Sequence, residues 1–152
     1  MIFLDMDGVL ADFDSHHEGM LGRRPSREAD DVDWTQVRAV DDFYLNIPPM
    51  ADMDELWRFV SPYEPAVLTG VPNYNTVPDA AANKRAWIRK HIGPHVTVIC
   101  CRSKDKCLYA KPGDILIDDW EKHRDLWLLA GGRWITHTSA ADTIKKLRRL
   151  LA

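Results

Sequence analysis

Short apolar runs recur along the chain, and they constrain its fold more than any other feature of the sequence. The first run is IFLDMD (residues 2–7), and three similar runs follow: PAVLTG (65–70), VTVICC (96–101) and DILIDD (114–119). A fifth, weaker run is RWITHT (133–138). Runs that stay apolar without alternating are typical of strands covered on both faces, as in parallel sheets. The sequence therefore predicts buried parallel strands at these positions.

The segments between these runs have the period of helices. Asp52 and Glu55 have the spacing of a capping box, and apolar residues follow at i, i+3, i+4 and i+7: Met53, Leu56, Trp57 and Val60. Residues 83–93 and 121–132 have helical patterns that end at glycine, and Ser139 opens a last helix. This alternation predicts an α/β fold, a Rossmann-like parallel sheet with helices on both faces.

Residues 15–51 interrupt the alternation. Their middle part, GRRPSREADDVDW (22–34), is polar and shows no clear period. We interpret residues 15–51 as a small cap inserted after the first strand, with a core formed by residues 1–14 and 52–152. A chain of 152 residues suits one domain of this kind. We expect His16 and His17, at the start of the cap, to face solvent.

Charge, hydropathy and cysteine content exclude several classes of function. A formal net charge of −3 offers no basic surface to the phosphates of long nucleic acid. No apolar run approaches the roughly 20 residues of a membrane helix, and the N-terminus has no pattern of a secretion signal. Cys100, Cys101 and Cys107 fit neither a zinc site nor a disulfide framework. We expect reduced thiols near a buried strand, in a cytoplasmic protein that does not bind membranes.

Polar residues follow the predicted strands, and in a parallel sheet the strand ends meet at one edge, where ligands bind. The residues at these ends are Asp5, Asp7, Thr69, Gly70, Cys101 to Ser103, Asp118 and Asp119. Four aspartates at one edge would repel one another without a cation. A divalent ion with oxygen ligands, such as Mg²⁺, is the natural solution.

A calcium loop of the EF-hand kind is the competing interpretation of the first aspartate pair, and it fails on spacing. Counted from Asp5, the fifth position is Val9, the sixth is Leu10 where glycine is needed, and the twelfth is His16 where glutamate is needed. The pair suits phosphoryl transfer better. One carboxylate beside Mg²⁺ can attack phosphorus, and the second can act as general acid and base.

The hydroxyl of Thr69 and the backbone N–H of Gly70 suit the oxygens of a phosphate. Together with these residues, the motifs DMDGVLADF (5–13), LTG (68–70), a lysine in the next helix and ILIDDW (115–120) occur in one order. This order resembles the haloacid dehalogenase superfamily of phosphotransferases. The resemblance spans the chain and implies a Rossmann-like core with a cap after the first strand.

The resemblance also assigns roles to the site residues. It implies that Asp5 is the nucleophile that forms an aspartyl-phosphate and that Asp7 is the acid and base, with a backbone carbonyl on Mg²⁺. Thr69 would bind the phosphoryl group. Asp118 and Asp119 would complete the metal site with Asp5 and Asp7. Adjacent strand residues point in opposite directions, so we expect one direct ligand from the second pair, and similarity to the closest subgroup favours Asp119.

The presence of Asp7 narrows the class. Dehalogenases of the superfamily lack this second aspartate and its P-type pumps have threonine there, so the resemblance implies a phosphatase. The closest similarity is to the 5'(3')-deoxyribonucleotidases, which have counterparts of DFYLNIPPM (42–50), of NKRAW (83–87) with its HIGP, and of SKDK (103–106) with its GDILIDD. The chain departs from them in a shorter cap and in LTG, which stands where they have Thr-Ser-Pro.

In that subgroup the lysine of the third motif corresponds to Lys84, and a second lysine near the phosphate corresponds to Lys106. Lys104, Lys106 and Lys111 are nearby alternatives for the third-motif lysine. The resemblance further implies that Phe13 lies against a nucleobase, together with Phe43 or Tyr44. Among the tryptophans we expect Trp57, Trp87 and Trp127 in the core, and Trp34 and Trp120 are candidates for the wall of a pocket.

These observations predict a Mg²⁺-dependent phosphomonoesterase with an aspartyl-phosphate intermediate. The expected substrate is a small phosphorylated molecule, most simply a deoxynucleoside or nucleoside 5'-monophosphate. The alternatives are a phosphatase for another small phosphoester, such as a sugar phosphate, and a binding module that kept the fold without turnover. A homo-oligomer is compatible with the sequence.

Overall fold

A five-stranded parallel sheet forms the centre of the protein, whose computed structural model describes all 152 residues. Its strands are β1 (Ile2–Leu4), β2 (Ala66–Gly70), β3 (Val98–Cys101), β4 (Ile115–Asp118) and β5 (Arg133–Thr136). The strand order is β3-β2-β1-β4-β5. Each predicted apolar run contains one of these strands, and the predicted α/β fold class is confirmed.

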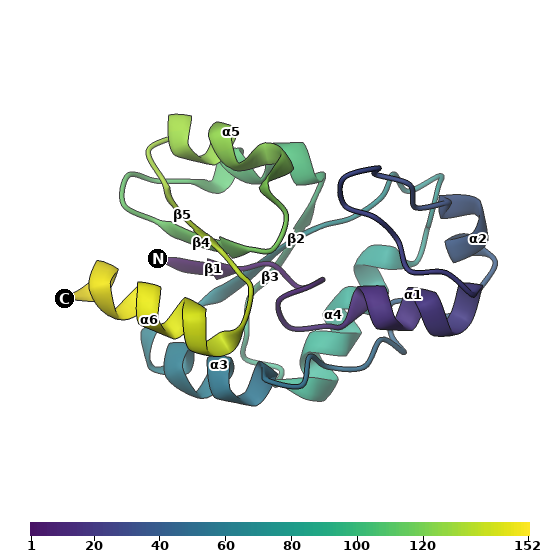
Figure 1. Cartoon of the computed structure of the whole chain (residues 1–152), viewed down its shortest axis with the longest axis horizontal. Helices are drawn as coiled ribbons and strands as arrows, with labels where there is room; N and C mark the ends of the chain where they lie inside the picture. The colour runs from purple at the N-terminus through teal and green to yellow at the C-terminus, as the bar shows by residue number, and fades with distance from the viewer.

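Six α-helices accompany the strands (Figure 1). They are α1 (Phe13–Leu21), α2 (Trp34–Arg38), α3 (Met53–Val60), α4 (Ala80–His91), α5 (Arg124–Leu129) and α6 (Ala140–Leu151). Three short 3₁₀ helices are η1 (Ser61–Tyr63), η2 (Ser103–Tyr109) and η3 (Glu121–His123). None of the helices combines the length and apolar character that crossing a membrane requires.

Helices cover both faces of the sheet, because successive strand residues point to opposite faces. Ile2 and Leu4 of β1 belong to the larger core cluster, together with residues of α3, α4 and α6. Phe3, between them, belongs to a smaller cluster with Trp127 of α5. In Figure 1, α5 accordingly lies on one side of the strands and α3 and α6 on the other.

Two predictions about local structure were wrong in an instructive way. Asp52 precedes α3 as predicted, but its side chain does not cap that helix. Its Oδ2 instead accepts a hydrogen bond of 2.7 Å from the backbone N–H of Ala140, at the start of α6. The carboxylate thus joins two helices that pack side by side on one face.

The second prediction concerns β3, which was expected to be a buried strand. It is only half-buried because it is an edge strand, and Cys100 and Cys101 are half-buried with it.

The chain leaves the core after β1 and returns before α3, and the two crossing points are hydrogen-bonded to each other. The N–H of Asp12 donates to the carbonyl of Pro48 (2.8 Å), and the N–H of Met50 donates to the carbonyl of Leu10 (2.8 Å). The segment between them contains α1 and α2, which lie together at one end of the molecule (Figure 1).

Helix α1 was not predicted, because two of its buried positions are histidines. Asp12 caps it by accepting from the N–H of Ser15. Phe13, His16 and His17 then form its buried stripe at i, i+3 and i+4. The prediction that both histidines face solvent was wrong: their exposed fractions are 7% and 0%. Nδ1 of His17 forms a hydrogen bond of 2.7 Å with the carbonyl oxygen of Arg23. Burial lowers the pKa of His16.

Candidate active site

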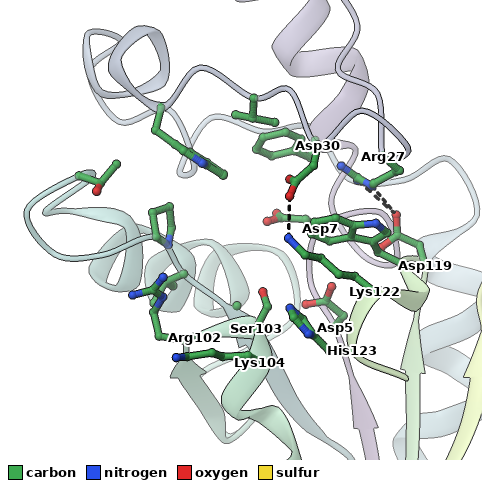
Figure 2. A pocket seen from close by; sticks show the side chains of 18 of the residues that line it. Asp5, Asp7, Arg27, Asp30, Arg102, Ser103, Lys104, Asp119, Lys122 and His123 are labelled. Carbon is green, nitrogen blue, oxygen red and sulfur yellow. Dashed lines mark hydrogen bonds and ion pairs between the residues drawn. The ribbon is translucent and has the colours of Figure 1, made fainter. Parts of the chain in front are cut away.

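A cavity of about 440 Å³ separates the carboxyl edge of the sheet from the inserted segment. Asp5 and Asp7 form part of its floor, and Arg27 and Trp34 of the insertion border it from the other side. Figure 2 shows carboxylates and cations from both parts of the chain pointing into this space. The location is that expected for a ligand of a parallel sheet.

A buried lysine holds Asp7. The Nζ of Lys84, on α4, donates to Oδ2 of Asp7 (2.8 Å), to Oγ1 of Thr69 (2.9 Å) and to the carbonyl of Gly70 (2.7 Å). All three ammonium hydrogens therefore have acceptors although the side chain is 0% exposed. The ring of Tyr44 lies 4.7 Å from the same ammonium group. Burial raises the pKa of Asp7, and the charge of Lys84 opposes that rise.

A second buried lysine holds Asp5. The Nζ of Lys106, on η2, lies 3.1 Å from Oδ1 of Asp5 and 2.7 Å from Oδ2 of Asp118. The N–H of Met6 also donates to Oδ1 of Asp5 (2.8 Å). Burial alone would lower the pKa of Lys106, but Asp5 and Asp118 reverse this effect and raise it. Each of the first two aspartates thus has its own ammonium partner.

These contacts distinguish the four lysines that are candidates for the third-motif lysine. Lys84 and Lys106 lie beneath the floor of the cavity, where each touches one aspartate of the first pair. Lys104 borders the cavity at its exposed rim (Figure 2). Lys111 is exposed and does not border the cavity.

The insertion contributes a cation that the sequence analysis did not identify. Arg27 lies 3.2 Å from Oδ2 of Asp119 and 3.2 Å from Oδ1 of Asp14. Its guanidinium group stands between the rings of Phe13 and Trp120, 5.9 and 6.0 Å from their centroids. In the sequence Arg27 is one of several charged residues in a polar stretch, and no motif marks it.

Three carboxylates are placed to hold a cation. Asp5, Asp118 and Asp119 each offer an oxygen, and these oxygens lie within 4.8 Å of one another. Burial, with the charge of Asp5, raises the pKa of Asp118 to about 6 and that of Asp119 to about 7. Crowding of this kind is relieved when a divalent cation binds, and an all-oxygen donor set fits Mg²⁺. The side chain of Asp7 is outside this group, because it faces Lys84.

The aromatic residues form a cluster at the base of the insertion. Phe13 lies within 6.1 Å, centroid to centroid, of both Phe43 and Tyr44, and it is only 3% exposed. Phe43 does not border the cavity, whereas Phe13 and Tyr44 do. The half-buried Trp34 and Trp120 also border it, in agreement with their position as candidates for its wall. Trp87 and Trp127 are buried and Trp57 is half-buried.

Gly8 allows Asp119 to approach the first loop. Its φ of +79° lies in the left-handed region, and a Cβ at this position would lie 2.1 Å from Oδ2 of Asp119. A side chain here would therefore displace one of the three clustered carboxylates. Gly22 has the same φ of +79° but nothing within 4 Å of the position of its missing Cβ. Substitution of Gly22 therefore tests backbone strain alone, whereas substitution of Gly8 tests strain together with close contact.

We expect Gly22→Ala to lower the free energy of unfolding by about 1–2 kcal/mol, the cost of a left-handed alanine. Gly8→Ala should lower it further and should also weaken Mg²⁺ binding, because Asp119 has to move. Urea denaturation and calorimetric titration with Mg²⁺ measure the two effects. Equal Mg²⁺ affinity in Gly8→Ala and Gly22→Ala would show that Asp119 takes no part in a metal site.

Comparison with known proteins extends the description of the fold. No protein-family model and no curated protein matches the sequence. Two solved structures of L-2-haloacid dehalogenase from Xanthobacter autotrophicus, one with chloropropionic acid covalently bound, are similar to the whole chain. For each, the TM-score is 0.53 and the identity 13%, over 97% of this chain and 82% of that one. The protein therefore has the fold of these dehalogenases.

Proposed function

We propose that the protein is a Mg²⁺-dependent phosphomonoesterase that forms an aspartyl-phosphate on Asp5. The observation that carries this proposal is the pairing of the first two aspartates with separate buried lysines, beside a cluster of three carboxylates. Asp5, Asp118 and Asp119 would hold the ion. When bound, Mg²⁺ would offset the charge of the phosphate and allow a carboxylate to approach it.

The contacts of Asp5 favour Oδ2 as the attacking atom. Oδ1 already accepts from Met6 N–H and interacts with Lys106, which leaves Oδ2 for the new bond to phosphorus. As this bond forms, the bond between phosphorus and the ester oxygen breaks. Lys106 fixes the orientation of the carboxylate, so the nucleophile is held in place before the substrate arrives.

Asp7 suits the transfer of protons. Its Oδ2 faces Lys84, while its Oδ1 is buried without a hydrogen-bond partner. Burial raises the pKa of Asp7, which favours a carboxylic acid that can donate to the departing ester oxygen. The resulting carboxylate can then take a proton from the water that hydrolyses the aspartyl-phosphate.

Thr69 and Lys84 support the transferring phosphoryl group from below. Thr69 is fully buried and does not itself border the cavity; its hydroxyl accepts from Lys84, and its own hydrogen would be the one to donate to a phosphoryl oxygen. The ammonium group of Lys84 supplies positive charge at the same place. Stabilisation of developing charge by fixed donors of this kind is a large term in catalysis.

The first test is hydrolysis of p-nitrophenyl phosphate. We expect Mg²⁺-dependent release of p-nitrophenol by the wild type and none by Asp5→Asn, because an amide cannot form the phosphoenzyme. The exposed Asp54→Asn on α3 is the matched control and should retain activity. Circular dichroism checks that both variants are folded.

Two outcomes would contradict this proposal. Activity of Asp5→Asn within about tenfold of the wild type would exclude covalent catalysis, since general acid–base effects alone supply about 10²–10⁴. Release of chloride from L-2-chloropropionate, without release of phosphate from any phosphoester, would indicate a dehalogenase. The same preparation serves both assays.

The role of Asp7 predicts a dependence on the leaving group. Asp7→Asn should lose about 10²–10⁴ in kcat on an alkyl phosphate, whose oxygen must be protonated as it departs. The loss should be smaller on p-nitrophenyl phosphate, because p-nitrophenolate departs with little protonation. Equal losses on the two substrates would leave Asp7 without the acid role.

We further propose that the substrate is a nucleoside or deoxynucleoside 5'-monophosphate. What supports this is the aromatic side of the cavity, where Trp34 and Trp120 are half-buried and border the space. A flat base stacked on an aromatic ring gains about 1–3 kcal/mol, by analogy with single-stranded nucleic acid sites. Phe13 is better suited to hold the cluster together, because it is almost fully buried.

A pair of substrates tests the nucleobase. We expect kcat/KM for a deoxynucleoside 5'-monophosphate to exceed that for deoxyribose 5-phosphate by about tenfold or more, the factor given by about 1.4 kcal/mol. Trp34→Ala should remove most of this preference. Trp57→Ala, a matched change on α3 outside the cavity, should retain it. Equal turnover of both substrates would favour a sugar phosphate phosphatase instead.

The cytoplasmic location and the homo-oligomer that were expected from the sequence stay predictions.

A further inference from the structure

We infer that the hydroxyl of Ser103 binds the transferring phosphoryl group, and that it does so from the space that a side chain at residue 70 would fill. The inference rests on the proposed phosphatase function and gives a role to a residue to which the sequence motifs assign none. It starts from the contact between Gly70, the last residue of β2, and Ser103, the first residue of η2.

The two residues are close because their strands are neighbours. In the parallel pairing of β2 with β3, Gly70 lies opposite Cys101. The chain then turns at Arg102 and enters η2, which brings Ser103 over Gly70. A Cβ at Gly70 would lie 2.0 Å from Oγ of Ser103. The hydroxyl therefore occupies the place of a side chain on residue 70.

Space, and not backbone geometry, explains the glycine. Gly70 is absent from the residues with positive φ, so its backbone can accommodate an L-amino acid. Any such residue would instead displace the hydroxyl of Ser103. Glycine at position 70 and serine at position 103 thus form one unit, in which the second residue supplies the polar group that the first lacks.

The serine faces the nucleophile together with Lys106. Residues i and i+3 of a 3₁₀ helix are eclipsed, so Ser103 and Lys106 lie on the same side of η2. Lys106 reaches Asp5 at 3.1 Å. One helical turn therefore presents both an ammonium group and a hydroxyl toward Asp5, and Figure 2 shows Ser103 beside this aspartate.

The hydroxyl is available to a ligand. Ser103 borders the cavity of about 440 Å³ together with Asp5 and Gly70, and it also borders a smaller space of about 30 Å³ that Asp5 and Lys106 line. Ser103 Oγ forms no hydrogen bond with another group of the protein, whereas the hydroxyl of Thr69 is engaged by Lys84. A phosphoryl group on Asp5 would find the Thr69 hydroxyl on one strand and the Ser103 hydroxyl beside the next.

The test is a double-mutant cycle at positions 70 and 103. We expect Ser103→Ala to weaken binding of inorganic phosphate and to lower kcat/KM by about 10- to 100-fold, as for loss of one donor to a charged oxygen. Gly70→Ser alone should also lose activity, because its Cβ collides with the Ser103 hydroxyl. The double variant should be more active than either single variant, because the serine introduced at position 70 then supplies the hydroxyl.

The remaining contact in the double variant is tolerable. The new Cβ would lie 3.2 Å from Cβ and 3.3 Å from Cα of residue 103, and a shift of a few tenths of an ångström relieves both contacts. Ser15→Ala, a matched change on the exposed side of α1, should leave activity and phosphate affinity unchanged. Thermal unfolding separates the two effects, since Ser103→Ala should melt near the wild-type temperature and Gly70→Ser below it.

Two measurements distinguish failure of this inference from failure of the proposed function. If the wild type binds phosphate and releases it from substrates while Ser103→Ala matches it within about twofold, Ser103 is not a ligand. If the losses of activity in the two single variants add up in the double variant, residues 70 and 103 do not share one space, and this result would also overturn the inference. If the wild type hydrolyses nothing, calorimetric binding of phosphate still compares Ser103→Ala with the wild type. Absence of phosphate binding by the wild type would overturn both proposals.

Discussion

The site depends on two ammonium groups buried beneath a rim of carboxylates. Removing one partner of a buried ion pair costs about 3–5 kcal/mol, because the other charge is left without compensation. Lys84 meets this requirement with three acceptors, and Lys106 meets it with Asp5 and Asp118. Each lysine therefore fixes an aspartate, and the aspartate provides a hydrogen-bond acceptor for the buried ammonium group. The lysines come from α4 and η2, so the helices on the sheet and the strand ends are tied to one arrangement.

The insertion is held to the core in a different way. Its ion pairs with the core, Arg27 with Asp119 and Lys122 with Asp30, are partly exposed, and such pairs contribute at most about 1 kcal/mol. The buried aromatic cluster around Phe13 and the hydrogen bonds at the crossing points provide the stable attachment. Charged contacts at the rim can therefore exchange for contacts with a ligand, while the base of the insertion stays in place.

The sequence predicted the features that follow from the periodicity of apolar residues and from the order of the strands along the chain. Strand positions followed from apolar runs, and the meeting of Asp5, Asp7, Thr69 and Asp118 followed from the geometry of parallel strands. Contacts between distant segments were not predictable. Arg27 has no pattern that distinguishes it from neighbouring charges. The buried stripe of α1 was not recognised because two of its residues are histidines. Asp52 accepts its hydrogen bond from the start of α6 and not from the helix that it precedes. In each case a neighbour distant in sequence decides the role of the residue.

The balance of charge links these contacts to the proposed chemistry. Four carboxylates, those of Asp5, Asp7, Asp118 and Asp119, face three cations, those of Lys84, Lys106 and Arg27. With all four carboxylates ionised, these seven groups carry a surplus of one negative charge; burial, with the charge of Asp5, raises the pKa of Asp119 to about 7. A divalent cation reverses the surplus to one positive charge. In the proposed mechanism, the carboxylates that carry the surplus would also position the ion that attracts a phosphoester, so metal binding would promote substrate binding.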